Sequence, residues 1–339
     1  MNKLNVLVTG GAGYIGSHTS VELLDAGHSV IVVDNLSNSK IEAITRVEKI
    51  TGKKVKFYLG DIRDKSILDT IFTQNKIDAV INFAGFKAVG ESCEKPLEYY
   101  ENNINGVLVL AFAMREHGVK NLVFSSSATV YGTPKSPCIK EDFQTVASHP
   151  YGSSKFFIEN ILKDLYKADN SFNIAILRYF NPVGAHSSGL IGEDPKGIPN
   201  NLCPYITQVA VGKREYLGVF GDDYNTPDGT GIRDYIHVVD LARGHVLAVD
   251  KLKENPGLII ANLGTGKGSS VFDMLKAFER ALGKKIPYKV LPRRAGDIDE
   301  YYADPSYAEE LLGFKAEKTI DDMCKDALNW QLKNPNGYM

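Results

Sequence analysis

Short apolar runs alternate with longer amphipathic stretches through the first half of the chain, and this rhythm limits the possible folds more than any other feature. Runs rich in Val and Ile predict buried strands at residues 4–8, 29–34, 55–59, 79–83, 122–126 and 174–178. The stretches between them predict helices at 14–26, 39–50, 64–72, 97–117 and 151–168. Strands that alternate with helices predict an α/β protein whose parallel sheet carries helices on both faces.

The second half of the chain has a different texture. Gly, Pro and Asn crowd residues 181–201 and 221–231, which predicts a smaller, loop-rich α/β lobe for substrate, because long loops in a compact chain are usually functional. A length of 339 residues suits two domains. We place them at 1–180 and 181–339 and expect part of 234–265 to return to the main sheet. Thr319 and Asp322 have the spacing of a capping box at a helix start.

Composition and charge exclude several classes of function. Lys and Arg total 39 and Asp and Glu total 41, so the net charge of -2 offers no general attraction for nucleic acid or an anionic membrane. The four cysteines are widely spaced, which predicts neither a metal site nor a disulfide framework. The uncharged apolar stretch 102–114 is too short to span a bilayer, and the first residues do not have the pattern of a signal peptide. We therefore expect a cytoplasmic protein.

A glycine-rich turn follows the first predicted strand and opens a helix. Gly10, Gly13 and Gly16 permit a tight turn and a close approach of the backbone to a pyrophosphate, which would also meet the positive end of the helix. Asp34 ends the second strand 18 residues after Gly16, where a carboxylate binds the ribose hydroxyls of a dinucleotide. The glycine turn between a strand and a helix predicts a Rossmann-type, doubly wound sheet. The Asp34 carboxylate repels a 2′-phosphate, so the pattern predicts that this sheet binds NAD rather than NADP.

A hydroxyl, a phenol and an ammonium follow at the end of the fifth strand and the start of the next helix. Ser127 closes the run of serines at 125–127, and Tyr151 and Lys155 are four residues apart, on one face of the predicted helix. A phenol is a poor base at neutral pH, but a nearby ammonium and a bound nicotinamide would lower its pKa. The tyrosine could then accept a proton from a sugar hydroxyl.

Several segments together resemble the UDP-glucose 4-epimerases of the extended short-chain dehydrogenase/reductase family, over essentially the whole chain. They are residues 9–17, 83–92, 125–132, 151–155, 178–185, 197–201 and 233–237. The resemblance implies that Tyr151 is the base, that Lys155 tunes it and holds the nicotinamide ribose, and that Ser127 helps to relay the proton. His237 is more readily interpreted as structural, because Tyr151 already fills the role of base.

The resemblance also implies two sets of binding residues. Those for NAD are Gly10, Gly13, Tyr14, Ile15, Gly16, Asp34, Asn35, Leu36, Ser37, Asn38, Ser39, Asp61, Ile62, Phe83, Ala84, Gly85, Phe86, Lys87, Asn102, Ser127, Tyr151, Lys155 and Phe180. Those for the UDP-sugar are Ser127, Thr129, Tyr151, Asn181, Asn201, Leu202, Gly218, Val219, Phe220, Arg233, Arg294, Asp297 and Tyr301. The two arginines suit a diphosphate, because guanidinium forks match its oxygens.

The implied activity is the interconversion of UDP-galactose and UDP-glucose, through a 4-keto intermediate and with tightly bound NAD, in galactose metabolism. One alternative is a 4,6-dehydratase, whose relatives carry Asp-Glu after the strand-end hydroxyl, where this chain has Ala128 and Thr129. A second alternative is a regulator that binds NAD without catalysis; such a protein need not retain the serine, tyrosine and lysine together.

Two further expectations concern assembly and selectivity. The predicted helix at 97–117 is apolar almost all round, and the one at 151–168 also carries several large apolar residues. The resemblance implies that these two helices meet their copies in a homodimer. Tyr301 matches the family position that borders the sugar 2-substituent. Its ring would disfavour N-acetylated sugars, although the neighbouring Tyr302 leaves that assignment ambiguous by one residue.

Overall fold

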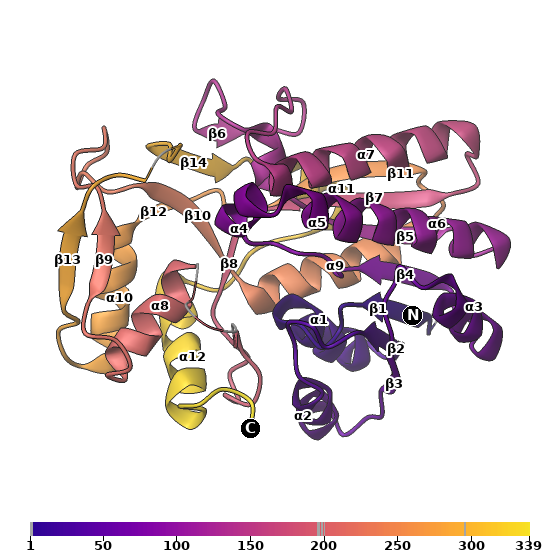
Figure 1. Cartoon of the computed structure of the whole chain (residues 1–339), viewed down its shortest axis with the longest axis horizontal. Helices are drawn as coiled ribbons and strands as arrows, with labels where there is room; N and C mark the ends of the chain where they lie inside the picture. Colours follow the sequence, from indigo (N-terminus) through magenta and orange to yellow (C-terminus); the bar gives the residue numbers. More distant parts are fainter. Residues whose placement is uncertain (1–2, 195–196, 198, 200, 295) are drawn as a thin grey trace.

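A parallel sheet of seven strands forms the centre of the larger part of the molecule (Figure 1). The structure is a computed structural model that describes residues 3–194, 197, 199, 201–294 and 296–339. In spatial order the strands are β11 (Leu258–Leu263), β7 (Asn173–Tyr179), β5 (Asn121–Ser127), β4 (Ala79–Asn82), β1 (Asn5–Thr9), β2 (Ser29–Asp34) and β3 (Lys56–Leu59). The order reverses direction between β1 and β4, and this confirms the predicted doubly wound, Rossmann-type sheet.

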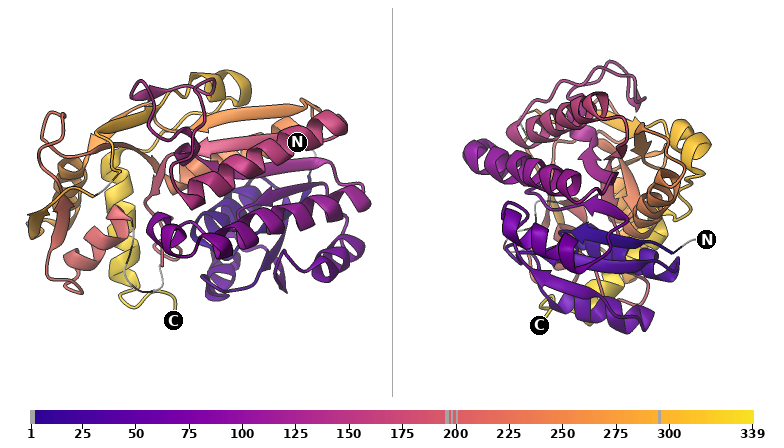
Figure 2. Two further views of the ribbon diagram at one scale, coloured as in Figure 1. Left: turned by 45° about the horizontal axis from the view of Figure 1, so that its top comes forward. Right: turned by 90° about the vertical axis from the view of Figure 1, so that its right-hand side faces the viewer.

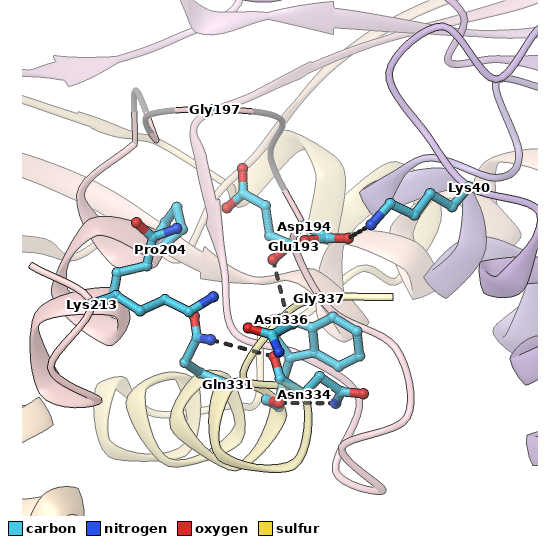
Figure 3. Close-up of a pocket in the computed structure, with 12 residues that line it drawn as sticks. Lys40, Glu193, Asp194, Gly197, Pro204, Lys213, Gln331, Asn334, Asn336 and Gly337 are labelled. Atoms are coloured by element: carbon cyan, nitrogen blue, oxygen red, sulfur yellow. Dashed lines mark hydrogen bonds and ion pairs between the residues drawn. The ribbon is translucent and has the colours of Figure 1, made fainter. Parts of the chain in front are cut away.

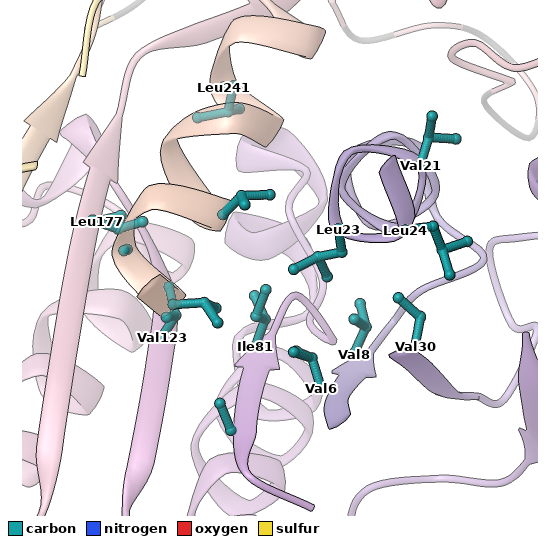
Figure 4. Close-up of a cluster of buried hydrophobic side chains, with 14 of the residues drawn as sticks. Val6, Val8, Val21, Leu23, Leu24, Val30, Ile81, Val123, Leu177 and Leu241 are labelled. Atoms are coloured by element: carbon teal, nitrogen blue, oxygen red, sulfur yellow. The ribbon is translucent and has the colours of Figure 1, made fainter. Parts of the chain in front are cut away.

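Helices cover both faces of this sheet, and each face has its own apolar core. On one face lie α1 (Tyr14–Asp25), α2 (Glu42–Thr51), α9 (Val238–Leu252) and α11 (Ser306–Leu312). On the other lie α3 (Lys65–Gln74), α6 (Gly106–Glu116) and α7 (Pro150–Ala168), and the end view shows the layers (Figure 2). Side chains along a strand alternate between the two cores: Val6 and Val8 point toward Leu23 (Figure 4), and Leu7 packs into the opposite core.

The helix predicted at 97–117 is not regular. It begins as α5 (Pro96–Tyr100), widens into a π-helical turn at Glu101–Asn105 and continues as α6. In the widened turn, Asn103 accepts a hydrogen bond from the Phe86 N–H at 2.8 Å and donates one to the Phe86 carbonyl at 3.1 Å. Its amide also donates to the Ser154 hydroxyl at 3.0 Å. The π turn therefore joins the loop after β4, which contains α4 (Val89–Glu94), to α7.

The second lobe is built on smaller sheets. One contains β12 (Gly268–Ser270), β10 (Ile232–His237), β14 (Glu300–Ala303) and β6 (Cys138–Ile139), with β8 (Asn181–Val183) paired to β10. The other pairs β9 (Leu217–Phe220) with β13 (Tyr288–Leu291). Helices α8 (Leu202–Ala210), α10 (Val271–Leu282) and α12 (Ile320–Lys333) complete its core. The predicted capping box of Thr319 and Asp322 is present at the start of α12.

The predicted elements of the first half match the structure to within one or two residues, except that α2 begins at Glu42 rather than at residue 39. Three elements from beyond residue 180, α9, β11 and α11, belong to the main sheet and its cover, and β11 pairs with β7 along its whole length. The division at residue 180 stays a prediction. Within the described ranges, no helix is both long and apolar enough to pass through a bilayer.

Candidate active site

The glycine-rich turn lies at the carboxyl end of β1 and leads directly into α1. Gly10 has a φ of +70°, and its N–H donates to the Val33 carbonyl at 2.8 Å. A Cβ on Gly16 would lie 2.4 Å from the Gly10 carbonyl oxygen, so only glycine permits this close packing. Gly13 occupies the N-cap position without a side chain, and the first turn of α1 has no acidic residue. The helix start therefore presents its N–H groups to an anion, which fits a pyrophosphate.

Asp34 lies beside this turn at the end of β2 and is largely buried. Its carboxylate accepts hydrogen bonds from the Ala12 N–H at 3.0 Å, the Leu36 N–H at 2.9 Å and the Ser39 hydroxyl at 2.8 Å. The side chain thus fixes the glycine turn and the loop after β2 to each other. A carboxylate held between a phosphate-sized turn and a loop fits the ribose of a dinucleotide.

Ser127, Tyr151 and Lys155 come together at the carboxyl end of β5. Ser127 is the last residue of that strand, and its hydroxyl accepts a hydrogen bond from the Thr129 hydroxyl at 3.0 Å. Tyr151 and Lys155 lie on the first two turns of α7, and both are buried. The Lys155 ammonium donates to the Ser125 carbonyl at 2.7 Å, which connects α7 to the strand that carries Ser127.

The start of α7 is capped by a histidine that the sequence prediction did not include. The His149 ring accepts a hydrogen bond from the Gly152 N–H at 3.0 Å through Nδ1, and it lies parallel to the Tyr151 ring with centroids 6.0 Å apart. An imidazole that accepts at Nδ1 is neutral. Burial lowers the pKa of His149, which favours this neutral form.

Burial dominates the electrostatics of this cluster. It raises the pKa of Tyr151, against the opposing effect of a hydrogen bond with Ser127. It also lowers the pKa of Lys155 to about 8, while the Glu159 carboxylate acts in the opposite direction. The sequence argument expected the Lys155 ammonium and a bound nicotinamide to lower the pKa of Tyr151. In the protein alone the pKa moves upward, because desolvation penalises the phenolate.

The residues expected to hold the UDP-sugar form a chain of contacts in the second lobe. The Tyr301 hydroxyl donates to the Asn181 amide oxygen at 3.3 Å, and the Arg233 guanidinium lies 4.9 Å from the centroid of the Tyr301 ring. Asp297 approaches Arg233 at 3.7 Å and Arg294 at 3.6 Å. The Arg294 guanidinium in turn lies 4.4 Å from the centroid of the Phe220 ring, beside Gly218 and Val219 on β9.

The structure also separates Tyr301 from Tyr302. The centroid of the Tyr301 ring lies 5.7 Å from that of the Phe180 ring. The Tyr301 hydroxyl also adds to the rise in the pKa of Tyr151, after the larger effect of burial. Tyr302 is paired instead with Cys138 at the outer strand β6. Of the two tyrosines, Tyr301 is therefore the one beside the predicted cofactor and substrate residues.

The remaining predicted cofactor residues follow the ends of neighbouring strands. Asn35 donates to Asp61 at 2.9 Å beyond β2 and β3, and Ile62 lies next to this pair. Beyond β4, Phe83 packs on the His245 ring at 4.7 Å. Ala84, Gly85 and Phe86 continue that loop, and Asn102 lies in the π turn that faces it.

Glu193 joins the cofactor and substrate sets, and sequence reasoning missed it. Its carboxylate accepts hydrogen bonds from Lys87 at 3.0 Å and from Asn201, just before Leu202, at 2.9 Å. Residues 198 and 200 of the segment predicted at 197–201 lie outside the described residues. A cavity of about 230 Å³ opens beside Glu193, and Lys40 and Asp194 meet at its wall at 3.1 Å (Figure 3). Lys40, which lines this cavity, directly follows the predicted cofactor segment 34–39. Tyr151 is not among the residues that line the cavity.

A glycine turn after the first parallel strand, with a serine, a tyrosine and a lysine at the end of β5, is the arrangement of an extended short-chain dehydrogenase/reductase. The family model described as GDP-mannose 4,6 dehydratase matches residues 7–327. The chain is 60% identical to the UDP-glucose 4-epimerase of Pasteurella multocida and 57% identical to that of Bacillus subtilis, with at least 98% of each chain covered.

Solved structures give the same result. The chain superposes on the UDP-glucose 4-epimerase of Bifidobacterium longum, solved in complex with NAD+ and UDP, with a TM-score of 0.95 and 59% identity. The alignment covers 98% of this chain and 100% of that one. The chain therefore belongs to the UDP-glucose 4-epimerase family.

The close packing at Gly16 gives a test of the cofactor site. Gly16→Ala would force a methyl group against the Gly10 carbonyl oxygen and open the turn. Overpacking of this kind costs about 1–3 kcal/mol, so we expect NAD to bind about 5- to 150-fold more weakly. The measurement is the dissociation constant of NAD, by calorimetry on the stripped protein. Gly90→Ala is the control, because a Cβ on Gly90 meets no atom within 4 Å. Equal NAD affinities in the two variants would show that the glycine turn is not part of the NAD site.

Proposed function

We propose that this protein interconverts UDP-galactose and UDP-glucose by inverting C4 of the hexose, with NAD as its bound cofactor. The observation that carries the proposal is the burial of Ser127, Tyr151 and Lys155 together at the end of β5, at the same edge of the sheet as a glycine turn suited to a pyrophosphate. Membership of the UDP-glucose 4-epimerase family supports the same reaction.

In its phenolate form Tyr151 accepts the proton of the sugar 4-hydroxyl and becomes the neutral phenol, and the Ser127 hydroxyl bonds both groups. Bound NAD supplies the hydride acceptor for C4 and returns the same hydride, so no net oxidation occurs. Because burial raises the pKa of Tyr151, the phenol alone is neutral near pH 7. Lys155 supplies a cation four residues away, and a charge of that sign favours the phenolate when the site is filled.

The second lobe holds the nucleotide part of the substrate. Arg233 and Arg294 present guanidinium groups on either side of Asp297, where a diphosphate would bind. Among the described residues, Ser127, Tyr151 and Asn181 are the ones we propose to meet the hexose. Firm anchoring of UDP and loose holding of the sugar suit a reaction in which the 4-keto sugar must turn over between two hydride transfers.

A 4,6-dehydratase is the second candidate, and the matching family model carries that description. Elimination of water needs an additional acid and base next to the strand-end hydroxyl. At those positions this chain has Ala128, which is buried in an apolar cluster, and Thr129, whose hydroxyl donates to Ser127. Neither can transfer a proton as a carboxylate pair does, so epimerisation is favoured. A regulator without catalysis would not need Ser127, Tyr151 and Lys155 in one buried cluster.

The proposed reaction is tested by incubating the purified protein with UDP-galactose and no added NAD. We expect UDP-glucose to form, and we expect Tyr151→Phe to lower kcat by about 100- to 10,000-fold, the usual effect of losing a general base. Chromatography of the two UDP-sugars gives the rates. Tyr166→Phe, farther along the same helix, is the control and keeps the wild-type rate. A folded Tyr151→Phe variant with normal turnover would exclude this base.

We also propose that Tyr301 limits the size of the sugar 2-substituent. Its ring is held between Phe180 and the Arg233 guanidinium, and its hydroxyl is bonded to Asn181. The ring therefore has a fixed position and cannot swing away from an acetamido group without losing these contacts. Forced overlap in a packed site costs about 1–3 kcal/mol.

We expect the wild-type protein to have a lower kcat/KM for UDP-N-acetylgalactosamine than for UDP-galactose, by about 5- to 150-fold. Tyr301→Cys removes the ring and brings the two values closer together. Tyr302→Cys, on the opposite face of the strand, is the matched control and leaves the ratio unchanged. Equal kcat/KM values in the wild type would contradict the proposal, and an unchanged ratio in Tyr301→Cys would place the limit elsewhere.

We propose that the protein is a homodimer through α5, α6 and α7. Large apolar side chains lie exposed on these neighbouring helices: Leu97 is 77% exposed, Phe112 48% and Phe157 46%. The Phe157 ring lies 6.2 Å from the Tyr100 ring, so the patch is continuous from α7 to α5. An exposed apolar patch across adjacent helices is typical of a protein interface. A two-fold axis through it would form a four-helix bundle.

Light scattering at micromolar concentration should give the mass of two chains for the wild type. Phe157→Asp places a charge in the centre of the patch, and we expect it to shift the mass to that of one chain. Leu332→Asp, at an exposed apolar residue of α12, is the control and keeps the dimer. A monomeric wild type would rule out this interface.

A further inference from the structure

A buried ion pair lies directly behind the catalytic cluster. The Glu159 carboxylate accepts hydrogen bonds from the Arg178 guanidinium at 2.9 and 2.6 Å, and a third from the Ser126 hydroxyl at 2.6 Å. Glu159 and Ser126 have no exposed surface, and Arg178 is 2% exposed. The three residues come from α7, β7 and β5, so one carboxylate joins a helix to two adjacent strands.

The guanidinium extends this network to the rest of the sheet edge. The second arm of Arg178 donates to the Tyr131 hydroxyl at 2.9 Å and to the Glu141 carbonyl at 3.1 Å. The Tyr131 hydroxyl in turn donates to the Asn262 amide oxygen on β11 at 2.7 Å. The helical turn after Ser127, the loop that precedes α7 and the outer strand are therefore all tied to the same pair.

Stability alone does not explain such a pair. Removing two charges from water is expensive, and replacing a buried ion pair with apolar residues of similar size is often neutral or stabilising. The position of the pair suggests a different role. Ser126 directly precedes Ser127, and Glu159 lies one helical turn beyond Lys155 and two turns beyond Tyr151.

We infer that Glu159, Arg178 and Ser126 are positioning residues, which fix the rotation and height of α7 against the end of β5 so that Tyr151 and Lys155 meet Ser127. This inference rests on the proposed function. Hydrogen bonds in two directions from a single carboxylate leave the helix no freedom to slide or turn relative to the strand. A displacement of about 1 Å between reacting groups can lower a rate on the order of 100-fold.

Glu159 has a second effect, through charge. Lys155 faces the Ser125 carbonyl and the Phe124 ring, and Glu159 is the charged group that opposes its loss of a proton. Glu159 itself faces Arg178 and, at 3.7 Å, Lys163. Without the carboxylate, burial would lower the pKa of Lys155 further below about 8, and the ammonium would be lost at a lower pH.

The phenol has separate neighbours, which the substitutions leave in place. Tyr151 faces the Ser127 hydroxyl, the Tyr301 hydroxyl and the neutral His149 ring, and it interacts with Tyr99 and Tyr179. A change in pH dependence that follows the loss of Glu159 can therefore be assigned to Lys155.

Three variants test the inference. Glu159→Gln keeps the shape and removes the charge, Glu159→Asp keeps the charge and shortens the reach, and Ser126→Ala detaches β5 while the ion pair remains. The control is Asn173→Ala. Asn173 is buried at the other end of β7 and bonds Asn121 on β5 at 3.2 Å, so it joins the same two strands away from the site. For each variant we would measure the thermal midpoint, and kcat and KM for UDP-galactose across pH 6–10.

We expect Glu159→Gln to lower kcat by about 10- to 100-fold with KM changed less than about 2-fold. The basic limb of its kcat profile should move to lower pH. Glu159→Asp should restore the basic limb while kcat stays low, and Ser126→Ala should lower kcat by about 2- to 10-fold, the value of one hydrogen bond. Asn173→Ala should lower the thermal midpoint and leave kcat and its pH profile unchanged.

If Glu159→Gln does not fold, Ser126→Ala decides the question, because it leaves both charges paired. Wild-type kcat and an unchanged pH profile in the folded variants, with only a lower thermal midpoint, would show a structural role and overturn the inference. A wild-type protein without epimerase activity is a separate result, since it is seen before any variant is made and overturns the proposed function together with the inference that rests on it.

Discussion

Parallel alignment of β1, β4, β5 and β7 is the constraint on which the rest of the site depends. Because all four strands run the same way and lie side by side, their carboxyl ends form one edge. The glycine turn, the loop after β4, Ser127 and the segment from Phe180 to Asn181 all leave the sheet at that edge. Groups that are far apart in the sequence are thereby placed along one edge of the sheet.

The second lobe depends on the same edge. β8 begins two residues after β7 ends and pairs with β10, which in turn pairs with β14. Tyr301 on β14 is thus carried to a position beside Asn181, and Arg233 on β10 lies against its ring. The contact between Tyr301 and Arg233 connects the residue proposed to limit the sugar 2-substituent with the groups that are to hold a diphosphate.

Burial is what gives the polar residues of the cluster their unusual properties. The buried lysine has a pKa of about 8, and the neighbouring phenol has a raised pKa. Both shifts favour the neutral forms, so a charged arrangement at this site needs support from other groups. Glu159 gives that support on the protein side, and it is itself stabilised by Arg178. The chemistry of Tyr151 and Lys155 therefore depends on Glu159 and Arg178, which lie behind them.

The sequence by itself determined the strands and helices of the first half, because a buried strand between amphipathic helices leaves a periodic pattern of apolar residues. It also determined the glycine turn, since only glycine fits where a Cβ would meet a carbonyl oxygen. It did not determine the π turn, which arises because Asn103 bonds a loop and a helix that are distant in sequence. Nor did it reveal the pairing of Glu159 with Arg178 or of Glu193 with Lys87 and Asn201. Those contacts have no local signal, and only the packing of helices and strands from different parts of the chain decided which charges meet.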